Sequence, residues 1–265
     1  MKTTIRPHHQ RAIENLSKAY IDDDRFLAMI IGGSVAKGCA REDSDIDFMI
    51  VATDDEFEER SKRDDLFINR KDLTDYSGGF VDGKIINMEY LHTVVAKGNE
   101  PTRAAFDGAF VTFSKVEGLA SMIEEIPVYP EATRDQKLRT FYAMSFIQNW
   151  LMTEADRHDN LYTQSRAASQ LVLFAGRLIL AYNRMLFPYH KWFYEYLGRC
   201  EKKPKDLIDK MNVVLRNPNK ANAEDLFQSI KAFQDWGVSD LDAYLWFMKD
   251  VEWSWMTDQE SLEDW

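Results

Sequence analysis

Residues 32–51 read GGSVAKGCAREDSDIDFMIV, and this stretch decides the fold. The apolar run FLAMII at 26–31 precedes it and predicts a buried strand that ends at Gly32 and Gly33. Glycines let backbone N–H groups approach a ligand closely, and Ser34 has the chemistry of a helix N-cap. A glycine-rich turn that opens a helix favours an anion, because unpaired N–H groups and the helix dipole both attract negative charge. The stretch therefore predicts a phosphate site at Gly32, Gly33 and Ser34.

Two aspartates follow at the point where the chain is expected to return to the sheet. The segment DIDFMIV at 45–51 predicts a second strand, in which Asp45 and Asp47 share one face while Ile46 and Phe48 face the core. Two carboxylates beside a phosphate site suit Mg²⁺, and two such ions about 3.5–4 Å apart assist in-line displacement at phosphorus. Burial of paired carboxylates without a cation is costly, so we prefer a metal site to a solvated acidic strand.

The order of these parts carries a family resemblance. A strand, GGS, a short spacer and DSDID on a second strand together resemble the signature of the nucleotidyltransferase superfamily typified by DNA polymerase beta. The resemblance is strong over residues 26–51 and extends to 84–114. The layout and length look most like the aminoglycoside and lincosamide nucleotidyltransferases.

The resemblance implies a role for each matching residue. Asp45 and Asp47 would bind the metal ions that hold a nucleoside triphosphate. Gly33 and Ser34 would contact its β- and γ-phosphates, with Ser44 as a helper.

The resemblance also implies a third carboxylate from a later strand. KIINMEYL at 84–91 predicts a strand with Asn87 and Glu89 on one face. The resemblance implies that Glu89 completes the metal site or takes a proton from the acceptor hydroxyl. The superfamily often has Asp at this position, and Glu fits its drug-modifying branch better. The alternative interpretation is an exposed polar residue on an edge strand.

The rest of the chain divides into two regions that differ in their hydrophobic periodicity. Residues 1–127 predict an α/β domain with further strands at 84–91 and 109–114, and with a solvated helix and loop in the charged segment 54–72. After Pro130, helical periodicity dominates and predicts an all-α domain over 130–265. Its expected helices cover 132–157, 161–186, 205–215, 222–236 and 239–255. The expected fold class is α+β: a small mixed-sheet nucleotidyltransferase domain, followed by a helical bundle that binds the acceptor.

One basic residue of the helical region is a further candidate. In YNRMLFPYHKW at 182–192, Pro188 should end a helix and leave Lys191 at a corner between helices. Related drug-modifying enzymes take basic residues from the helical domain to neutralise the phosphates, which makes Lys191 a triphosphate ligand by resemblance. A surface lysine beside a packed tryptophan is an equally good interpretation.

Composition limits the possible partners. The 265 residues include 33 Lys+Arg against 44 Asp+Glu, a net charge of −11, which argues against broad nucleic-acid binding. The two cysteines lie far apart and exclude a zinc ribbon or a disulfide framework. No apolar stretch approaches the roughly 20 residues of a membrane span, and the start MKTTIRPHHQ is polar, so we expect a cytoplasmic protein.

These observations and the resemblance together predict a function. A Mg²⁺-dependent enzyme with two ions would transfer a nucleoside monophosphate, expected to be AMP from ATP, to a hydroxyl of a small molecule. An aminoglycoside-like antibiotic is one such acceptor, and pyrophosphate is released. Adenylylation of a protein partner and a catalytically silent nucleotide-binding module are the alternatives.

Overall fold

The chain folds into two units, Met1–Val128 and Tyr129–Trp265, and each has a hydrophobic core of its own. The computed structural model describes residues 5–257. Residues 1–4 of the predicted α/β domain and residues 258–265 of the predicted helical domain lie outside this range.

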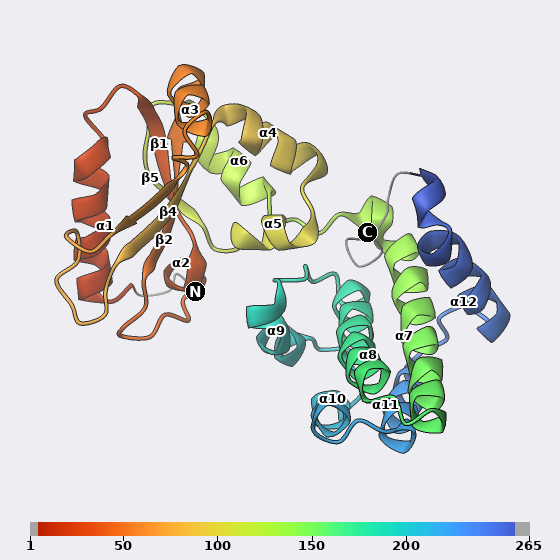
Figure 1. Cartoon of the computed structure of the whole chain (residues 1–265). Helices are drawn as coiled ribbons and strands as arrows, with labels where there is room; N and C mark the ends of the chain where they lie inside the picture. The colour runs from red at the N-terminus through yellow and green to blue at the C-terminus, as the bar shows by residue number, and fades with distance from the viewer. Residues whose placement is uncertain (1–4, 258–265) are drawn as a thin grey trace. The chain divides into compact units, whose positions relative to one another are not determined.

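A mixed five-stranded sheet forms the centre of the first unit (Figure 1). Its strand order is β3-β4-β2-β1-β5, in which β2 and β4 run parallel and the other neighbours run antiparallel. The strands are β1 (Phe26–Ile31), β2 (Ile46–Ala52), β3 (Phe67–Arg70), β4 (Val81–Ile86) and β5 (Phe110–Ser114). This mixed sheet, followed by a helical region, confirms the predicted fold class.

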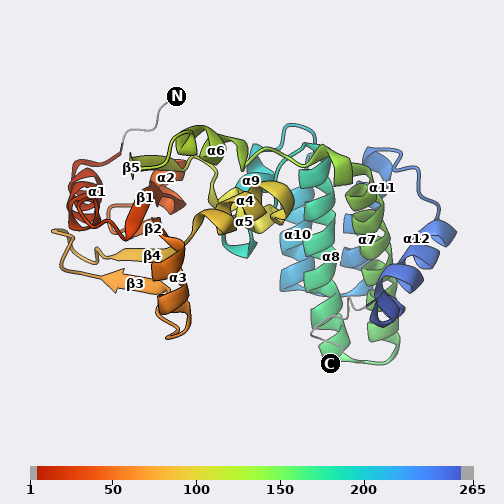
Figure 2. The ribbon, with the colours of Figure 1, turned by 90° about the horizontal axis from the view of Figure 1, so that it is seen from above.

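Helices cover both faces of the sheet, as the two views of the ribbon show (Figures 1 and 2). One face packs on α1 (Pro7–Tyr20), and the other packs on α4 (Met88–Lys97), α5 (Glu100–Ala105) and α6 (Leu119–Glu125). Alternation along β1 supplies both cores, since Met29 and Ile31 point to the α1 side while Ala28 and Ile30 point to the other. This double coverage explains why FLAMII is almost continuously apolar. Two short helices, α2 (Gly33–Lys37) and α3 (Asp54–Ser61), follow β1 and β2.

The strand predicted at 84–91 is wrong in its second half, because β4 ends at Ile86 and helix α4 begins at Met88. Asn87 is the N-cap of α4, and its side-chain oxygen accepts a hydrogen bond from the backbone N–H of Tyr90 at 3.0 Å. Leu91 and Val94 then point into the core with helical spacing. The predicted loop after the helix at 54–61 also contains a short edge strand, β3, and α5 was not predicted.

The second unit is helical throughout its described residues. Its α-helices are α7 (Arg134–Arg157), α8 (Leu161–Tyr182), α9 (Phe193–Arg199), α10 (Leu207–Arg216), α11 (Lys220–Phe233) and α12 (Asp240–Phe247). Short 3₁₀ segments cover Glu131–Thr133, His190–Trp192 and Ser254–Thr257, and a π-helical turn covers Met248–Glu252. The five predicted helices are present with shifted ends, and the short α9 is an addition at the predicted corner.

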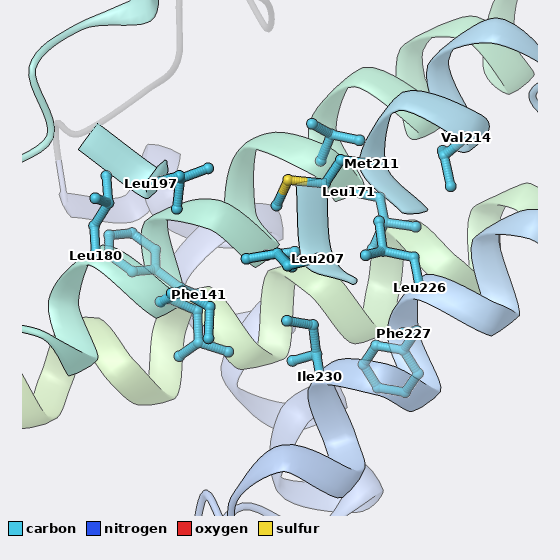
Figure 3. Close-up of a cluster of buried hydrophobic side chains, with 14 of the residues drawn as sticks. Phe141, Leu171, Leu180, Leu197, Leu207, Met211, Val214, Leu226, Phe227 and Ile230 are labelled. Atoms are coloured by element: carbon cyan, nitrogen blue, oxygen red, sulfur yellow. The ribbon is translucent and has the colours of Figure 1, made fainter. Parts of the chain in front are cut away.

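Five helices, α7 to α11, contribute to the core of the helical unit. Phe141 of α7, Leu171 of α8, Met211 of α10 and Phe227 of α11 belong to one buried cluster, shown in Figure 3. Within residues 5–257, no helix is both long enough and apolar enough to cross a bilayer.

Candidate active site

Three aspartates occupy one face of the sheet where β2 and β4 begin. Asp47 of β2 pairs in register with Asp82 of β4, and neighbouring strands lie about 4.8 Å apart. Paired residues share a face, and alternation places Asp45, two residues before Asp47, on the same side. All three are half-buried. Asp45 and Asp47 therefore lie on the same side of the sheet, and a third carboxylate that the sequence reasoning missed, Asp82, lies on that side with them.

The surroundings of Asp82 shift its ionisation. Partial burial raises the pKa of Asp82 above its ordinary value, and the negative charge of Asp45 raises it further. The nearby Lys84 acts in the opposite direction on the same pKa. Protonation of Asp82 is therefore favoured by its surroundings, as expected for carboxylates gathered without a cation.

The glycine turn lies directly against one of these carboxylates. Gly32 is extended and donates its N–H to the Asp47 carbonyl oxygen at 2.9 Å, which joins the turn to β2. Gly33 has a φ of +62°, and a Cβ atom added there would lie 1.7 Å from Oδ2 of Asp47. Only glycine leaves room for both the backbone and the carboxylate at this point.

The start of α2 has donors that its own helix does not use. The first bond of the turn runs from the Ala36 N–H to the Gly32 carbonyl at 3.3 Å, so the N–H groups of Gly33, Ser34 and Val35 precede it. Ser34 was expected to be the N-cap, but α2 begins at Gly33 and its N-cap is Gly32. The Ser34 hydroxyl is buried and has no hydrogen-bond partner among residues 5–257. A buried hydroxyl without a partner needs a ligand or water, and a phosphate oxygen would satisfy it.

Ser44, the predicted phosphate helper, is engaged in its own loop. Its hydroxyl accepts a hydrogen bond from the Arg41 N–H at 2.9 Å, and its carbonyl accepts one from the Tyr76 hydroxyl at 2.7 Å. These contacts stabilise the loop before Asp45. A direct contact between Ser44 and phosphate stays a prediction.

Glu89 is not on the face that carries the aspartates. It lies exposed in the first turn of α4, beyond the end of β4. The prediction that Glu89 and Asn87 share one face of a strand is therefore wrong. Its neighbour Asn87 donates a side-chain hydrogen bond to Asp54 Oδ1 at 3.1 Å. The catalytic and metal-binding roles of Glu89 stay predictions, whereas Asp82 of β4 lies on the strand face that carries Asp47.

Lys191 belongs to the helical unit. It is exposed in the turn His190–Trp192, and its Nζ lies 5.3 Å from the centroid of the Trp192 ring. This contact fits the surface-lysine interpretation, and the role of Lys191 toward a triphosphate stays a prediction.

The metal that the resemblance implies is Mg²⁺. Within residues 5–257, no group of three His, Cys, Asp or Glu side chains is arranged to hold a metal ion by itself. Protein-bound Mg²⁺, however, usually takes one or two carboxylates and completes its shell with water and substrate phosphates. The aspartate row and the unsatisfied Ser34 hydroxyl fit an ion that binds together with a triphosphate.

The predicted superfamily is confirmed by a family-model match over part of the first unit. Residues 13–77 match the family model of the nucleotidyltransferase domain, and this segment contains Gly33, Ser34, Asp45 and Asp47. The chain is also similar to a crystal structure of a nucleotidyltransferase-like protein from Exiguobacterium sibiricum 255-15. That similarity covers 92% of this chain and 80% of the other, at 8% identity and a TM-score of 0.49. No curated relative of the sequence was found. Within the first unit, residues 13–77 thus match a nucleotidyltransferase domain.

Proposed function

We propose that the protein is a Mg²⁺-dependent nucleotidyltransferase that moves AMP from ATP to a hydroxyl of a small molecule. The observation that carries the proposal is the row of Asp45, Asp47 and Asp82 beside the Gly33–Ser34 turn. Carboxylates on one side and the unsatisfied Ser34 hydroxyl on the other suit the two ends of a metal-bound triphosphate.

The reaction makes one bond and breaks one bond at phosphorus. The acceptor oxygen attacks the α-phosphorus, the bond to the oxygen bridging to the β-phosphorus breaks, and pyrophosphate leaves. Bound Mg²⁺ would neutralise the charge that develops on the phosphate oxygens. Asp45 and Asp47 would hold the ions, and Gly33 and Ser34 would hold the β- and γ-phosphates.

The proton of the acceptor hydroxyl needs a base. Asp82 is our first choice, because its surroundings already favour the protonated carboxyl that proton transfer would produce. Glu89, the predicted base, is the second choice. Its exposed position in α4 places it off the strand face.

The acceptor is proposed from charge. A net charge of −11 favours approach of a cationic molecule, and an aminoglycoside has both the charge and the hydroxyl groups.

The test separates binding from transfer. Calorimetry should show ATP binding that requires Mg²⁺ in the wild type and is lost in Asp47→Asn. Labelled ATP, incubated with a panel of aminoglycosides and other polyols, should yield an acceptor of mass increased by one AMP. Label on a protein band instead would favour protein adenylylation, and Mg²⁺-dependent binding without any product would favour a silent module. Absence of Mg²⁺-dependent ATP binding would refute the proposal.

A further inference from the structure

Asp45 differs from the other two aspartates in how its backbone is held. Asp47 and Asp82 lie inside paired strands, where the ladder fixes their positions. Asp45 precedes the first residue of β2, and the next ladder bond, from the Ile46 N–H to the Phe80 carbonyl at 3.0 Å, lies beyond it. The planar peptide group that joins Ser44 to Asp45 therefore needs another constraint.

Tyr76 supplies that constraint. Its hydroxyl donates to the Ser44 carbonyl oxygen at 2.7 Å, which is the oxygen of the peptide group leading into Asp45. Partial burial and the nearby charge of Asp45 raise the pKa of Tyr76 to about 12, so the hydroxyl keeps its proton and remains a donor at neutral pH. A planar peptide group that is fixed at its oxygen cannot rotate freely about the bonds on either side.

The segment that carries Tyr76 is itself anchored to helix α1. Arg11 of α1 forms an ion pair with Asp75 at 2.8 Å, and the Asn15 side chain donates to the Leu73 carbonyl at 3.3 Å. The Tyr76 ring packs against the ring of His8 at a centroid distance of 4.6 Å. The exposed ion pair is weak by itself, but the contacts act on one short segment and hold it on the helix.

Helix α1 also reaches the loop before Asp45 directly. Nε2 of His8 lies 3.0 Å from the Glu42 carbonyl oxygen, within hydrogen-bond distance. The loop between α2 and β2 is thus held at Glu42 by His8 and at Ser44 by Tyr76. Both contacts trace back to the same end of α1.

We propose that Tyr76 is a positioning residue, which orients the Ser44–Asp45 peptide group so that the Asp45 carboxylate can bind Mg²⁺. This role rests on the proposed function, because it assumes that Asp45 is a metal ligand. Partners that orient metal ligands typically contribute about 10–100-fold to metal affinity or activity. Loss of the Tyr76 hydroxyl should weaken the metal site while the fold remains intact.

The test compares Tyr76→Phe with the wild type and uses ATP binding as the readout, so no acceptor is needed. ATP affinity is measured by calorimetry over a range of Mg²⁺ concentrations, and the melting temperature of the metal-free protein is measured in parallel. Tyr194→Phe is the matched control, since it removes a buried hydroxyl that has no hydrogen-bond partner among residues 5–257. Asp45→Asn reports on the metal site itself.

We expect the Mg²⁺ concentration for half-maximal ATP binding to rise about 10-fold in Tyr76→Phe. ATP affinity at saturating Mg²⁺ and the melting temperature should stay close to wild type, and Tyr194→Phe should leave the Mg²⁺ midpoint unchanged. A lower melting temperature with an unchanged midpoint would show a merely structural role and overturn the proposal. If Asp45→Asn binds Mg²⁺ and ATP like the wild type, Asp45 is no ligand, and the positioning role fails together with the proposed metal site.

Discussion

Replacement of Gly33 by alanine tests the contact between the glycine turn and the aspartate row. The added Cβ would lie 1.7 Å from Oδ2 of Asp47, whereas real Cβ contacts are essentially never under 3.0 Å, so the two atoms must separate by at least 1.3 Å. A φ of +62° adds about 1–2 kcal/mol for a residue with a side chain, and the overpacking adds about 1–3 kcal/mol. The variant should therefore lose stability and displace the Asp47 carboxylate.

The displaced Asp47 carboxylate should weaken ATP binding far more than backbone strain would by itself. A misplacement of about 1 Å in a catalytic group can cost about 10²-fold, and we expect a loss of that order in Mg²⁺-dependent ATP affinity, measured by calorimetry. Gly118→Ala is the control, because Gly118 has a φ of +74° and no atom within 4 Å of an added Cβ. That variant should lose stability but keep its ATP affinity. Equal ATP affinities in Gly33→Ala and Gly118→Ala would refute the placement of the triphosphate at this turn.

Three further predictions concern the carboxylates. Asp47→Asn should abolish Mg²⁺-dependent ATP binding and transfer while the protein stays folded, and wild-type turnover would contradict the metal assignment. Asp82→Asn should reduce single-turnover transfer by about 10²–10⁴-fold if Asp82 is the base, whereas Glu89→Gln should remain nearly as active as the wild type. If Glu89→Gln loses transfer activity and Asp82→Asn keeps it in the same assay, the base is Glu89, as the sequence predicted. Because its surroundings raise the pKa of Asp82, ionisation of this group opposes folding at pH 7, and the opposition disappears when both states are protonated. Asp82→Asn should thus raise the melting temperature of the metal-free protein at pH 7 by calorimetry. The gain should shrink as the pH falls through the raised pKa of Asp82 toward the ordinary Asp value of about 3.9, and a gain that persists well below that pH would have another cause.

The residues found from sequence were those whose positions depend on local structure. Gly33 follows a buried strand and precedes a helix, and Asp47 alternates with apolar neighbours inside a strand, so each is fixed by a few adjacent residues. Both features are readable from the order of residues in one continuous stretch. The superfamily followed from that stretch alone.

The third carboxylate could not be found in the same way. Asp82 lies near the site because β4 pairs with β2 in parallel register, a contact between segments about 35 residues apart. The sequence VDGKII at 81–86 does alternate, with Val81 and Ile85 facing one core, and this pattern after Gly78-Gly79 was a usable signal.

The mistaken placement of Glu89 has a similar cause. Apolar residues at 86, 88 and 90 fit a strand, yet Leu91 and Val94 fit a helix, and short windows do not distinguish the two periods. In the structure, Asn87 is the N-cap of α4, and the residues after it are helical. An asparagine is an N-cap only when the following residues turn, which the alternating pattern concealed.

The pairing of Phe48 with Gly83 has a consequence for how relatives of this chain vary. A Cβ on Gly83 would lie 2.2 Å from the Phe48 ring, so the two positions share one fixed volume. A slip of one residue would move Asp82 to the opposite face, and the large ring opposite a glycine resists that slip. We therefore expect coupled substitution during evolution: a larger residue at position 83 should accompany a smaller one at position 48. The segment between β3 and β4 has less freedom, because Tyr76 within it contacts the Ser44 carbonyl oxygen.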